Sequence, residues 1–255
     1  GDEEQMAKLE EDIENMRKHI STYNVISEKD ILDIVNGKQT KIDAEKEVLV
    51  YSVSGKPIKS RSNNQQMLVD AFNKNDMVFA VGPAGTGKTY LSIALAVKSL
   101  KAKEVKKIIL SRPAVEAGEK LGFLPGDMKE KIDPYLQPLY DSLEDMIPAV
   151  KLQDMVDKHI IQIAPLAFMR GRTLNDAIII LDEAQNTSTA QIRMFLTRLG
   201  MNSKMIITGD LTQIDLPYHQ KSGLKEAVEI LNDTEGIAIV KLSQKDIVRH
   251  KLVTK

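Results

Sequence analysis

Short apolar runs, separated by segments with apolar residues three or four positions apart, dominate the chain from residue 77 onwards. The runs lie at 77–81, 107–111, 159–164, 177–182, 203–210 and 236–242. Their length and composition are typical of strands buried on both faces, and the intervening segments are typical of helices. Strands and helices that alternate in this way predict an α/β fold, with a mainly parallel sheet covered by helices on both faces.

A helical pattern precedes the predicted sheet. Within residues 2–20 the apolar side chains alternate in steps of three and four, at Met6, Leu9, Ile13, Met16 and Ile20. This heptad seam covers about two heptads, fewer than a stable coiled coil needs. The helix can therefore equally well dock onto the core or onto a neighbouring subunit instead of forming a coiled coil.

A second short helix and a strand are predicted before the main domain. Ser27 is the expected N-cap of the helix, Ile26 can pack against Ile31, and Gly37 ends it. Residues 47–53 alternate like a strand, and a polar connector follows.

We place a domain boundary near residue 46. Residues 1–46 are predicted to form a helical N-terminal extension, and residues 47–255 a single large domain.

The composition is that of an ordinary globular protein. Of 255 residues, 42% are hydrophobic and 28% are charged. No apolar run reaches the length of a membrane span and no signal peptide opens the chain, so we expect no membrane partner. The chain has no cysteine, which excludes a disulfide framework or a thiolate metal site and agrees with an expected cytoplasmic location.

The overall charge does not indicate a nucleic-acid-binding protein. The net charge is −1, so any contact with nucleic acid must be local. Five lysines between residues 98 and 107 form the densest basic run. A solvated surface is the usual explanation for such a run.

Candidate chemistry centres on the glycine-rich turn that follows the first apolar run. Residues 82–89 read GPAGTGKT and match the phosphate-binding pattern G-x-x-x-x-G-K-[ST]. The predicted nucleotide-binding residues are Gly82, Pro83, Ala84, Gly85, Thr86, Gly87, Lys88 and Thr89. We expect backbone N–H groups to surround the phosphates, Lys88 to reach the β and γ phosphates, and the hydroxyl of Thr89 to hold Mg²⁺. The glycine order does not match the dinucleotide pattern G-x-G-x-x-G.

Two carboxylates follow the apolar run at 177–182. Asp182 and Glu183 would lie at the carboxyl edge of the sheet, where ligands of such folds bind. We expect Asp182 to hold Mg²⁺ through water, and Glu183 to orient or deprotonate the water that attacks the γ phosphate. An acidic helix N-terminus is the structural alternative.

A third strand end carries Asp210 and Gln213 in the segment ITGDLTQID. An amide at this edge can hydrogen-bond both the γ phosphate and the attacking water. Gln213 is therefore predicted to sense the state of the nucleotide.

Six segments together resemble the PhoH family of bacterial ATPases, over most of the chain from Lys56 to Val253. They are GPAGTGKTYL, SRPAVEAGEKLGFLPGD, FMRGRTLNDAIIILDEAQN, QIRMFLTRLG, ITGDLTQIDLP and DIVRH. The family is similar to the first RecA-like domain of superfamily 1 helicases. It is described as cytoplasmic, ATP-binding and associated with RNA metabolism and phosphate starvation.

The resemblance implies a RecA-like P-loop ATPase that binds ATP and Mg²⁺. Asp182 and Glu183 would be its metal and catalytic carboxylates, Gln213 its sensor, and Gln65 the residue that reads adenine, with the adjacent Gln66 as the alternative.

The chain departs from the family pattern in two places. Longer members carry a further RNA-binding-like or nuclease-like domain for which residues 1–46 are too short, so the chain can be a fragment of a longer protein. Lys251 also follows DIVRH where the family commonly has proline.

The sequence contains one phosphate loop and one Asp-Glu strand end. Superfamily 1 helicases close two RecA-like domains on one ATP, and the second domain supplies an arginine finger that contributes orders of magnitude in rate. We expect any such arginine to come from another subunit, in a homo-oligomeric ring that the resemblance implies to be hexameric. Arg249 is the first candidate, Arg198 the second, and Arg170 and Arg172 follow. A surface arginine paired with a carboxylate is the alternative for each.

A long loop is predicted at residues 112–126, after the strand that follows the phosphate loop. Helicases contact the nucleic-acid backbone at this place. Arg112 and Lys120 are candidates for phosphate contacts and Phe123 for base stacking with single-stranded RNA. A core or interface position is the alternative for Phe123.

The predicted function is Mg²⁺-dependent ATP hydrolysis coupled to RNA binding or remodelling in an oligomeric ring. A nucleotide-gated oligomeric scaffold without an RNA substrate is the main alternative. A small-molecule kinase is disfavoured because Glu183 and Gln213 are residues suited to hydrolysis.

Overall fold

The structure is a computed structural model of the chain and describes residues 2–23, 26, 28–36, 48–113, 128–217 and 220–247. Several of the positions singled out above lie outside these residues: Ser27, Gly37, the boundary near 46, Lys120, Phe123 and Arg249.

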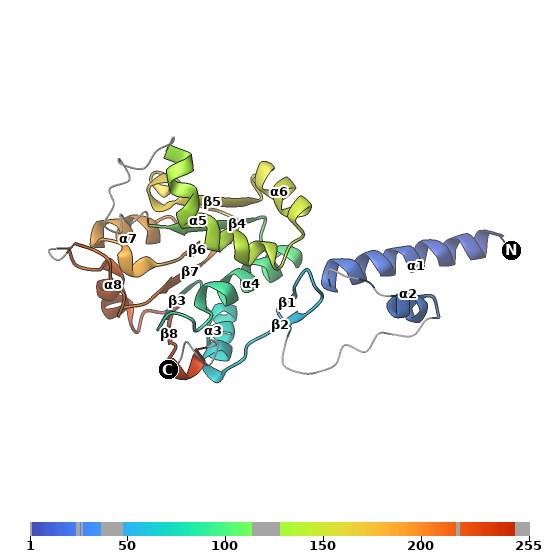
Figure 1. The fold of residues 1–255 in the computed structure, drawn as a ribbon, viewed down its shortest axis with the longest axis horizontal. Coiled ribbons are helices and arrows are strands. Elements are labelled where there is room, and N and C mark those ends of the chain that lie inside the picture. Colours follow the sequence, from blue (N-terminus) through green and yellow to red (C-terminus); the bar gives the residue numbers. More distant parts are fainter. Residues whose placement is uncertain are drawn as a thin grey trace.

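A six-stranded parallel sheet forms the centre of the molecule (Figure 1). Its strands are β3 (Met77–Val81), β4 (Lys107–Arg112), β5 (Ile161–Pro165), β6 (Ala177–Leu181), β7 (Lys204–Gly209) and β8 (Ile237–Lys241). Their order across the sheet is β5-β4-β6-β7-β3-β8, and every neighbouring pair is parallel. This confirms the predicted α/β class, and each strand coincides with one of the apolar runs to within two residues.

Helices cover both faces of the sheet (Figure 1). One face packs against α3 (Asn63–Lys74), α4 (Lys88–Lys101), α5 (Met128–Glu144) and α6 (Ala149–Asp157), and the other against the short helix η2 (Leu166–Met169), α7 (Thr189–Leu196) and α8 (Gly223–Leu231). Successive side chains of a strand point to opposite faces. Because both faces are covered, every residue of β3 and β6 is buried.

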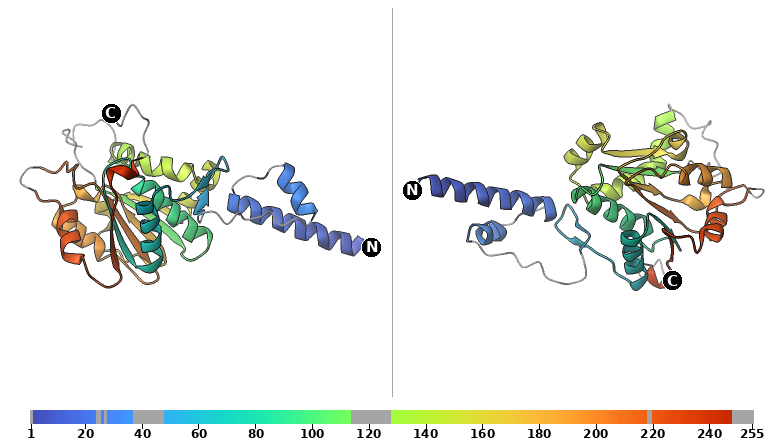
Figure 2. Two further views of the ribbon diagram at one scale, coloured as in Figure 1. Left: turned by 90° about the horizontal axis from the view of Figure 1, so that it is seen from below. Right: turned by 180° about the vertical axis from the view of Figure 1, so that it is seen from behind.

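The N-terminal elements stand away from this core (Figure 2). They are α1 (Asp2–Tyr23) and α2 (Glu28–Val35). Most of the apolar seam of α1 is exposed, with Met6 at 58%, Leu9 at 53% and Ile13 at 44% relative accessibility, whereas Met16 is half-buried. The seam therefore does not dock onto the sheet and its helices. A search of the described residues finds no helix that qualifies as a membrane span.

A small hairpin links the N-terminal elements to the main sheet. β1 (Val50–Tyr51) pairs antiparallel with β2 (Pro57–Ile58). The strand expected at 47–53 is therefore too long, because the chain turns back at Gly55, which has a φ of 79°.

The segment treated above as a polar connector also contains the start of α3, which the sequence prediction missed. Ser62 caps this helix by accepting a hydrogen bond from the backbone N–H of Gln65. Leu68, Val69 and Phe72 are buried against the sheet. The cap residue and the helical spacing of these three side chains were the available signal.

Parallel strands place all their carboxyl ends at one edge of the sheet. At this edge β3 leads into the phosphate-binding turn, β6 into Asp182 and β7 into Asp210. The three strands are adjacent, in the order β6-β7-β3. The predicted chemical residues are thus brought together by the strand order.

Candidate functional site

The turn at residues 82–87 leads from β3 into the N-terminus of α4. Gly85 and Gly87 have positive φ angles of 82° and 79°, which residues with a side chain rarely adopt. At Gly82 a Cβ atom would lie 2.5 Å from the carbonyl oxygen of Leu242. The turn therefore needs glycine for both backbone conformation and space, and it ends at a helix N-terminus, which favours phosphate binding.

Lys88 lies folded over the turn. Its Nζ donates to the carbonyl oxygens of Gly82 at 2.6 Å and Pro83 at 2.8 Å, and the residue is 8% exposed. Burial lowers the pKa of Lys88, although the carboxylates of Asp210, Glu183 and Asp182 oppose this. The ammonium group thus lies at the turn where phosphate binding is predicted.

Asp182 follows β6 and is 2% exposed. Its Oδ1 accepts hydrogen bonds from the hydroxyls of Thr89 at 2.6 Å and Thr208 at 2.5 Å. Its Oδ2 accepts one from Nε of Arg112 at 2.8 Å. The two residues predicted to hold metal, Thr89 and Asp182, are therefore in direct contact, and their oxygen atoms are the donor type that Mg²⁺ prefers.

Glu183 follows in a left-handed backbone conformation with φ 55°. For a residue other than glycine this costs about 1–3 kcal/mol and is frequent at functional sites. Its Oε2 accepts a hydrogen bond from Nε2 of Gln185 at 2.6 Å, and its Oε1 lies 3.4 Å from Nη2 of Arg112. The side chain is 45% exposed, so one partner on each oxygen orients a carboxylate that water can reach.

Asp210 connects the end of β7 to the phosphate-binding turn. Its Oδ2 accepts from the backbone N–H of Ala84 at 3.0 Å, and its Oδ1 accepts from the N–H and hydroxyl of Thr212. Burial opposes ionisation, yet these hydrogen bonds and Lys88 keep the pKa of Asp210 below its usual value.

Residues of all three motifs line one pocket of about 250 Å³. Among its lining residues are Lys88, Thr89, Asp182, Glu183 and Gln213. The structure therefore brings together at one place residues that are more than a hundred positions apart in the sequence.

A larger cavity of about 680 Å³ adjoins the turn on the side of the β1–β2 hairpin. Gln65 and Tyr90 line it, together with Ser52 and Lys56 of the hairpin. Sequence reasoning missed these hairpin residues. Tyr90 also borders the smaller pocket, so the two cavities are neighbours.

The amide of Gln65 is engaged within the protein. Its Nε2 donates to the carbonyl oxygen of Thr86 at 2.9 Å, and its Oε1 accepts from the N–H of Arg61 at 2.7 Å. Gln66 instead bonds to Ser60 and Asp70 and does not line the cavity.

The C-terminal segment supports the helix that carries Gln65. Asp246 is 5% exposed and accepts hydrogen bonds from Asn64 and from both the N–H and hydroxyl of Ser243. Although burial opposes ionisation, hydrogen bonds from Asn64, Ser62 and Ser243 lower the pKa of Asp246 to about 2. Asp246, the acidic residue of the DIVRH segment, therefore stabilises the start of α3 through its hydrogen bond from Asn64.

The candidate arginines lie in different surroundings. Arg198 donates to the carbonyl oxygens of Met194 at 3.0 Å and Arg172 at 3.0 Å, and Arg172 itself bonds to Gln162 at 2.7 Å. Arg170 is exposed. None of these three lines the 250 Å³ pocket.

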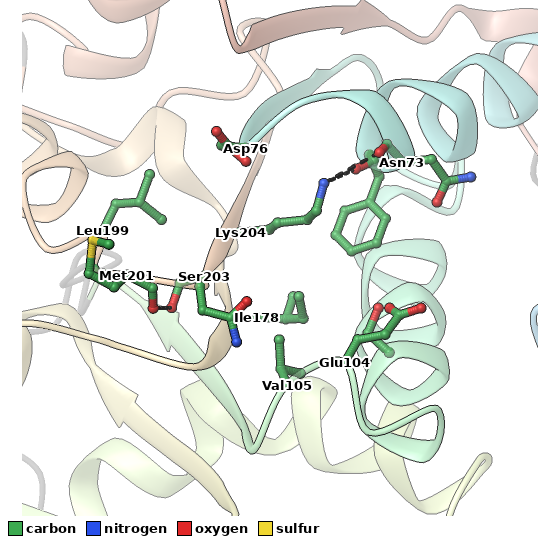
Figure 3. Close-up of a pocket in the computed structure, with 13 residues that line it drawn as sticks. Asn73, Asp76, Glu104, Val105, Ile178, Leu199, Met201, Ser203 and Lys204 are labelled. Atoms are coloured by element: carbon green, nitrogen blue, oxygen red, sulfur yellow. Dashed lines mark hydrogen bonds between the residues drawn. The ribbon is translucent and has the colours of Figure 1, made fainter.

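A third cavity, of about 520 Å³, lies at the amino-terminal ends of the strands, opposite the site (Figure 3). Lys204 reaches across it and donates to the carbonyl oxygens of Phe72 and Asn75 at the end of α3. Its Nζ lies 5.3 Å from the centre of the Phe72 ring. Lys204 thus stabilises the C-terminal end of α3 by donating to its last carbonyl groups. We assign no ligand to this cavity.

Sequence reasoning missed three residues of the site. Arg112 was expected to meet nucleic acid but contacts Asp182 and Glu183. Gln185 bridges Glu183 and the N–H of Asp210, and Thr208 bonds to Asp182. Closeness in sequence to DE and GD was the available signal for Gln185 and Thr208, whereas Arg112 lies 70 residues before Asp182.

Comparisons with known proteins agree on one family. The family described as "PhoH-like protein" matches residues 57–255. The chain is 54% identical over 235 residues to a PhoH-like protein of Bacillus subtilis, covering 90% of this chain and 74% of that one. It is 47% identical to a PhoH-like protein of Synechocystis, covering 99% and 79%. For a PhoH-like protein of Mycobacterium tuberculosis the identity is 57%, and the match covers 80% of this chain but 58% of that one.

Among solved structures the likeness is lower. A Sulfolobus solfataricus SWI2/SNF2 ATPase core in complex with dsDNA matches with a TM-score of 0.43 and 14% identity, over 71% of this chain and 43% of that one. Pif1 helicase from Candida albicans matches with a TM-score of 0.38 and 16% identity, over 72% and 39%.

Proposed function

This chain belongs to the PhoH family and has the fold of an ATPase-type, nucleotide-hydrolysing protein; from that premise we propose that it hydrolyses ATP with Mg²⁺ in a single active site. The observation that carries the proposal is the 250 Å³ pocket, in which Lys88, Thr89, Asp182, Glu183 and Gln213 converge. The chain spans 58% to 79% of the length of the three relatives described above. The proposal therefore concerns the ATPase domain that this chain contains.

Each residue has a role that follows from its position. Lys88 binds the β and γ phosphates, and Thr89 and Asp182 hold the metal, which neutralises phosphate charge. Glu183 orients or deprotonates the attacking water, because its carboxylate is both fixed and accessible. Gln213, at the rim of the same pocket, contacts the γ phosphate or the water.

The 680 Å³ cavity is the proposed site of the adenosine. It lies beside Gly85 and Gly87, and Gln65 is placed to read the base. Its bonds to Thr86 and Arg61 use one amide hydrogen and one lone pair of the amide oxygen, so a second donor and a second acceptor site are left for adenine. Binding of the base would then be sensed directly by the phosphate-binding turn.

Product analysis tests the hydrolysis. The wild-type chain should release ADP and phosphate from ATP only when Mg²⁺ is present, and Lys88→Ala should lose both affinity and turnover. Lys106→Ala is the matched control, since this exposed lysine precedes β4 at the opposite end of the strands. Equal turnover in Lys88→Ala and the wild type would contradict the proposal.

Contact with single-stranded RNA is the next part of the proposal. Of the phenylalanines in the described part of the chain, only Phe168 is exposed, at 61%, and Arg170 follows it on the same surface segment. An exposed aromatic ring next to an arginine suits base stacking with a nearby phosphate contact. Lys120 and Phe123 remain predictions.

Stimulation of ATP hydrolysis by RNA separates this function from a nucleotide-gated scaffold. Phe168→Ala should retain basal hydrolysis and lose most of the stimulation by single-stranded RNA. Met201→Ala, which removes an 82% exposed apolar side chain elsewhere, should retain it. A wild-type chain indifferent to RNA would favour the scaffold.

We further propose that the chain forms a homo-oligomeric ring, which the family resemblance implies to be hexameric. The proposed location is the cytoplasm. Arg198 already donates to backbone carbonyl groups, so Arg249 remains the first candidate for an arginine supplied by a neighbouring subunit. ATPase rate per subunit, measured together with molar mass by light scattering, should rise as the oligomer forms. A constant rate in a monomer would contradict the ring.

A further inference from the structure

Arg112 ends β4 and stands beside the two catalytic carboxylates. β4 pairs with β6 in parallel, with Ser111 opposite Leu181, so the next residues, Arg112 and Asp182, lie side by side. The Arg112 side chain is 18% exposed. Its guanidinium donates from Nε to Asp182 at 2.8 Å, from Nη2 to Glu183 at 3.4 Å, and from Nη1 to the carbonyl oxygen of Tyr135 at 2.9 Å.

Asp182 needs a positive partner when no metal is bound. A carboxylate that is 2% exposed has lost its hydration, and the hydroxyls of Thr89 and Thr208 carry no charge. Lys88 acts only at longer range, since its Nζ contacts Gly82 and Pro83. Within the described residues, Arg112 is the cation that forms an ion pair with Asp182.

A divalent cation would compete for the same carboxylate. A metal held between Thr89 and Oδ1 of Asp182 would add two positive charges beside a guanidinium that is 2.8 Å from Oδ2 of the same carboxylate. Like charges at such short distances repel one another, and a partly buried site screens this repulsion less than bulk water does. Full contact of Asp182 with both cations is therefore unfavourable.

We propose that Arg112 is a positioning residue that serves as the built-in counter-cation of Asp182 and Glu183. It holds both carboxylates while the metal is absent, and binding of Mg²⁺ with nucleotide displaces it from Asp182. This inference rests on the proposed function for the identity of the ligands. What it adds is that Arg112 and the metal compete for Asp182.

Two effects of opposite sign follow from this role. Removal of Arg112 leaves Asp182 without its competing cation, so metal should bind more tightly. The same removal takes one positive charge from the lining of the phosphate pocket, so nucleotide without metal should bind more weakly. A residue that only supported the fold would weaken both.

Mn²⁺ serves as the metal probe, since free Mn²⁺ is measured directly by electron paramagnetic resonance. For Arg112→Ala we expect Mn²⁺ to bind the nucleotide-free chain about tenfold more tightly than it binds the wild type. Binding of a fluorescent ADP in the presence of a chelator should weaken by a similar factor. Lys106→Ala, at the other end of β4, removes the same charge and should change neither affinity.

Two further variants separate charge from structure. Arg112→Lys keeps the charge but not the forked geometry, and should bind Mn²⁺ with nearly wild-type affinity. Arg112→Gln is neutral, can still hydrogen-bond, and should behave like Arg112→Ala; this comparison stands even if the alanine variant fails to fold.

Mn²⁺ binding that is unchanged or weaker in Arg112→Ala and Arg112→Gln would overturn the inference. Mn²⁺ binding by Arg112→Lys as tight as that expected for the neutral variants would overturn it too. The test is independent of turnover. A chain that hydrolyses no ATP but shows tighter Mn²⁺ binding without Arg112 would refute the proposed function and leave the counter-cation role standing.

Discussion

Gln185 offers a direct way to test how Glu183, the proposed catalytic carboxylate, is held. The residue is 1% exposed and bridges two strand ends, donating to Glu183 at 2.6 Å and accepting from the N–H of Asp210 at 3.0 Å. Gln185→Leu keeps the approximate volume and removes both hydrogen bonds. The buried N–H of Asp210 is then left without an acceptor.

The expected cost follows from the two bonds. A hydrogen bond to a charged group contributes about 1.5–3 kcal/mol and a neutral one about 0.5–1.5 kcal/mol, so the variant should lose about 2–4 kcal/mol of stability. In a domain of this size each kcal/mol lowers Tm by about 2–4 °C. Glu183 also loses the partner on one oxygen, so kcat should fall while ATP affinity changes little.

Differential scanning calorimetry and steady-state ATP hydrolysis measure the two effects. Gln153→Leu is the matched control, because Gln153 donates to Asp157 at 2.8 Å on the exposed surface of α6. Its stability should change by less than about 0.5 kcal/mol. If Gln185→Leu had the Tm and kcat of the wild type, the bridge between β6 and β7 would have no role in holding Glu183.

Three further predictions address the turn at Gly82, the hydrogen bond of Thr208 to Asp182, and Asp246. Gly82→Ala should abolish nucleotide binding measured by fluorescence titration, because the added Cβ would lie 2.5 Å from the backbone oxygen of Leu242. Thr208→Val should lower the free energy of unfolding in urea by about 1–3 kcal/mol, since Asp182 loses a buried hydroxyl donor. Asp246→Asn should destabilise the chain at neutral pH. Because folding lowers the pKa of Asp246 from 3.8 to about 2, the difference from the wild type should shrink as the pH falls through that interval.

Much of the fold follows from local pattern. Each strand of the sheet is a continuous apolar run, and burial on both faces dictates that pattern. The phosphate-binding turn was recognisable because glycine is required at fixed positions by φ angle and by space, as at Gly82 and Gly87. The two-residue length of β1 was not predictable in the same way, because the hairpin turn at Gly55 interrupts an alternation that reads as one longer strand.

The missing parts of the site depend on contacts between distant segments. Arg112 meets Asp182 only because β4 and β6 are neighbours in the sheet, although 70 residues separate them. Asp246 meets Asn64 across 182 residues. Such pairs follow from strand order and packing, which local periodicity does not specify.

We infer that Glu183 activates the water that hydrolyses ATP bound by this one chain. Rapid mixing of Mg·ATP with Glu183→Gln, followed by quantification of bound ATP and released phosphate, tests it most directly. We expect ATP to bind with nearly wild-type affinity and phosphate release to fall by at least about a hundredfold. Phosphate release at the wild-type rate by Glu183→Gln would contradict the assignment and the account of the site built on it.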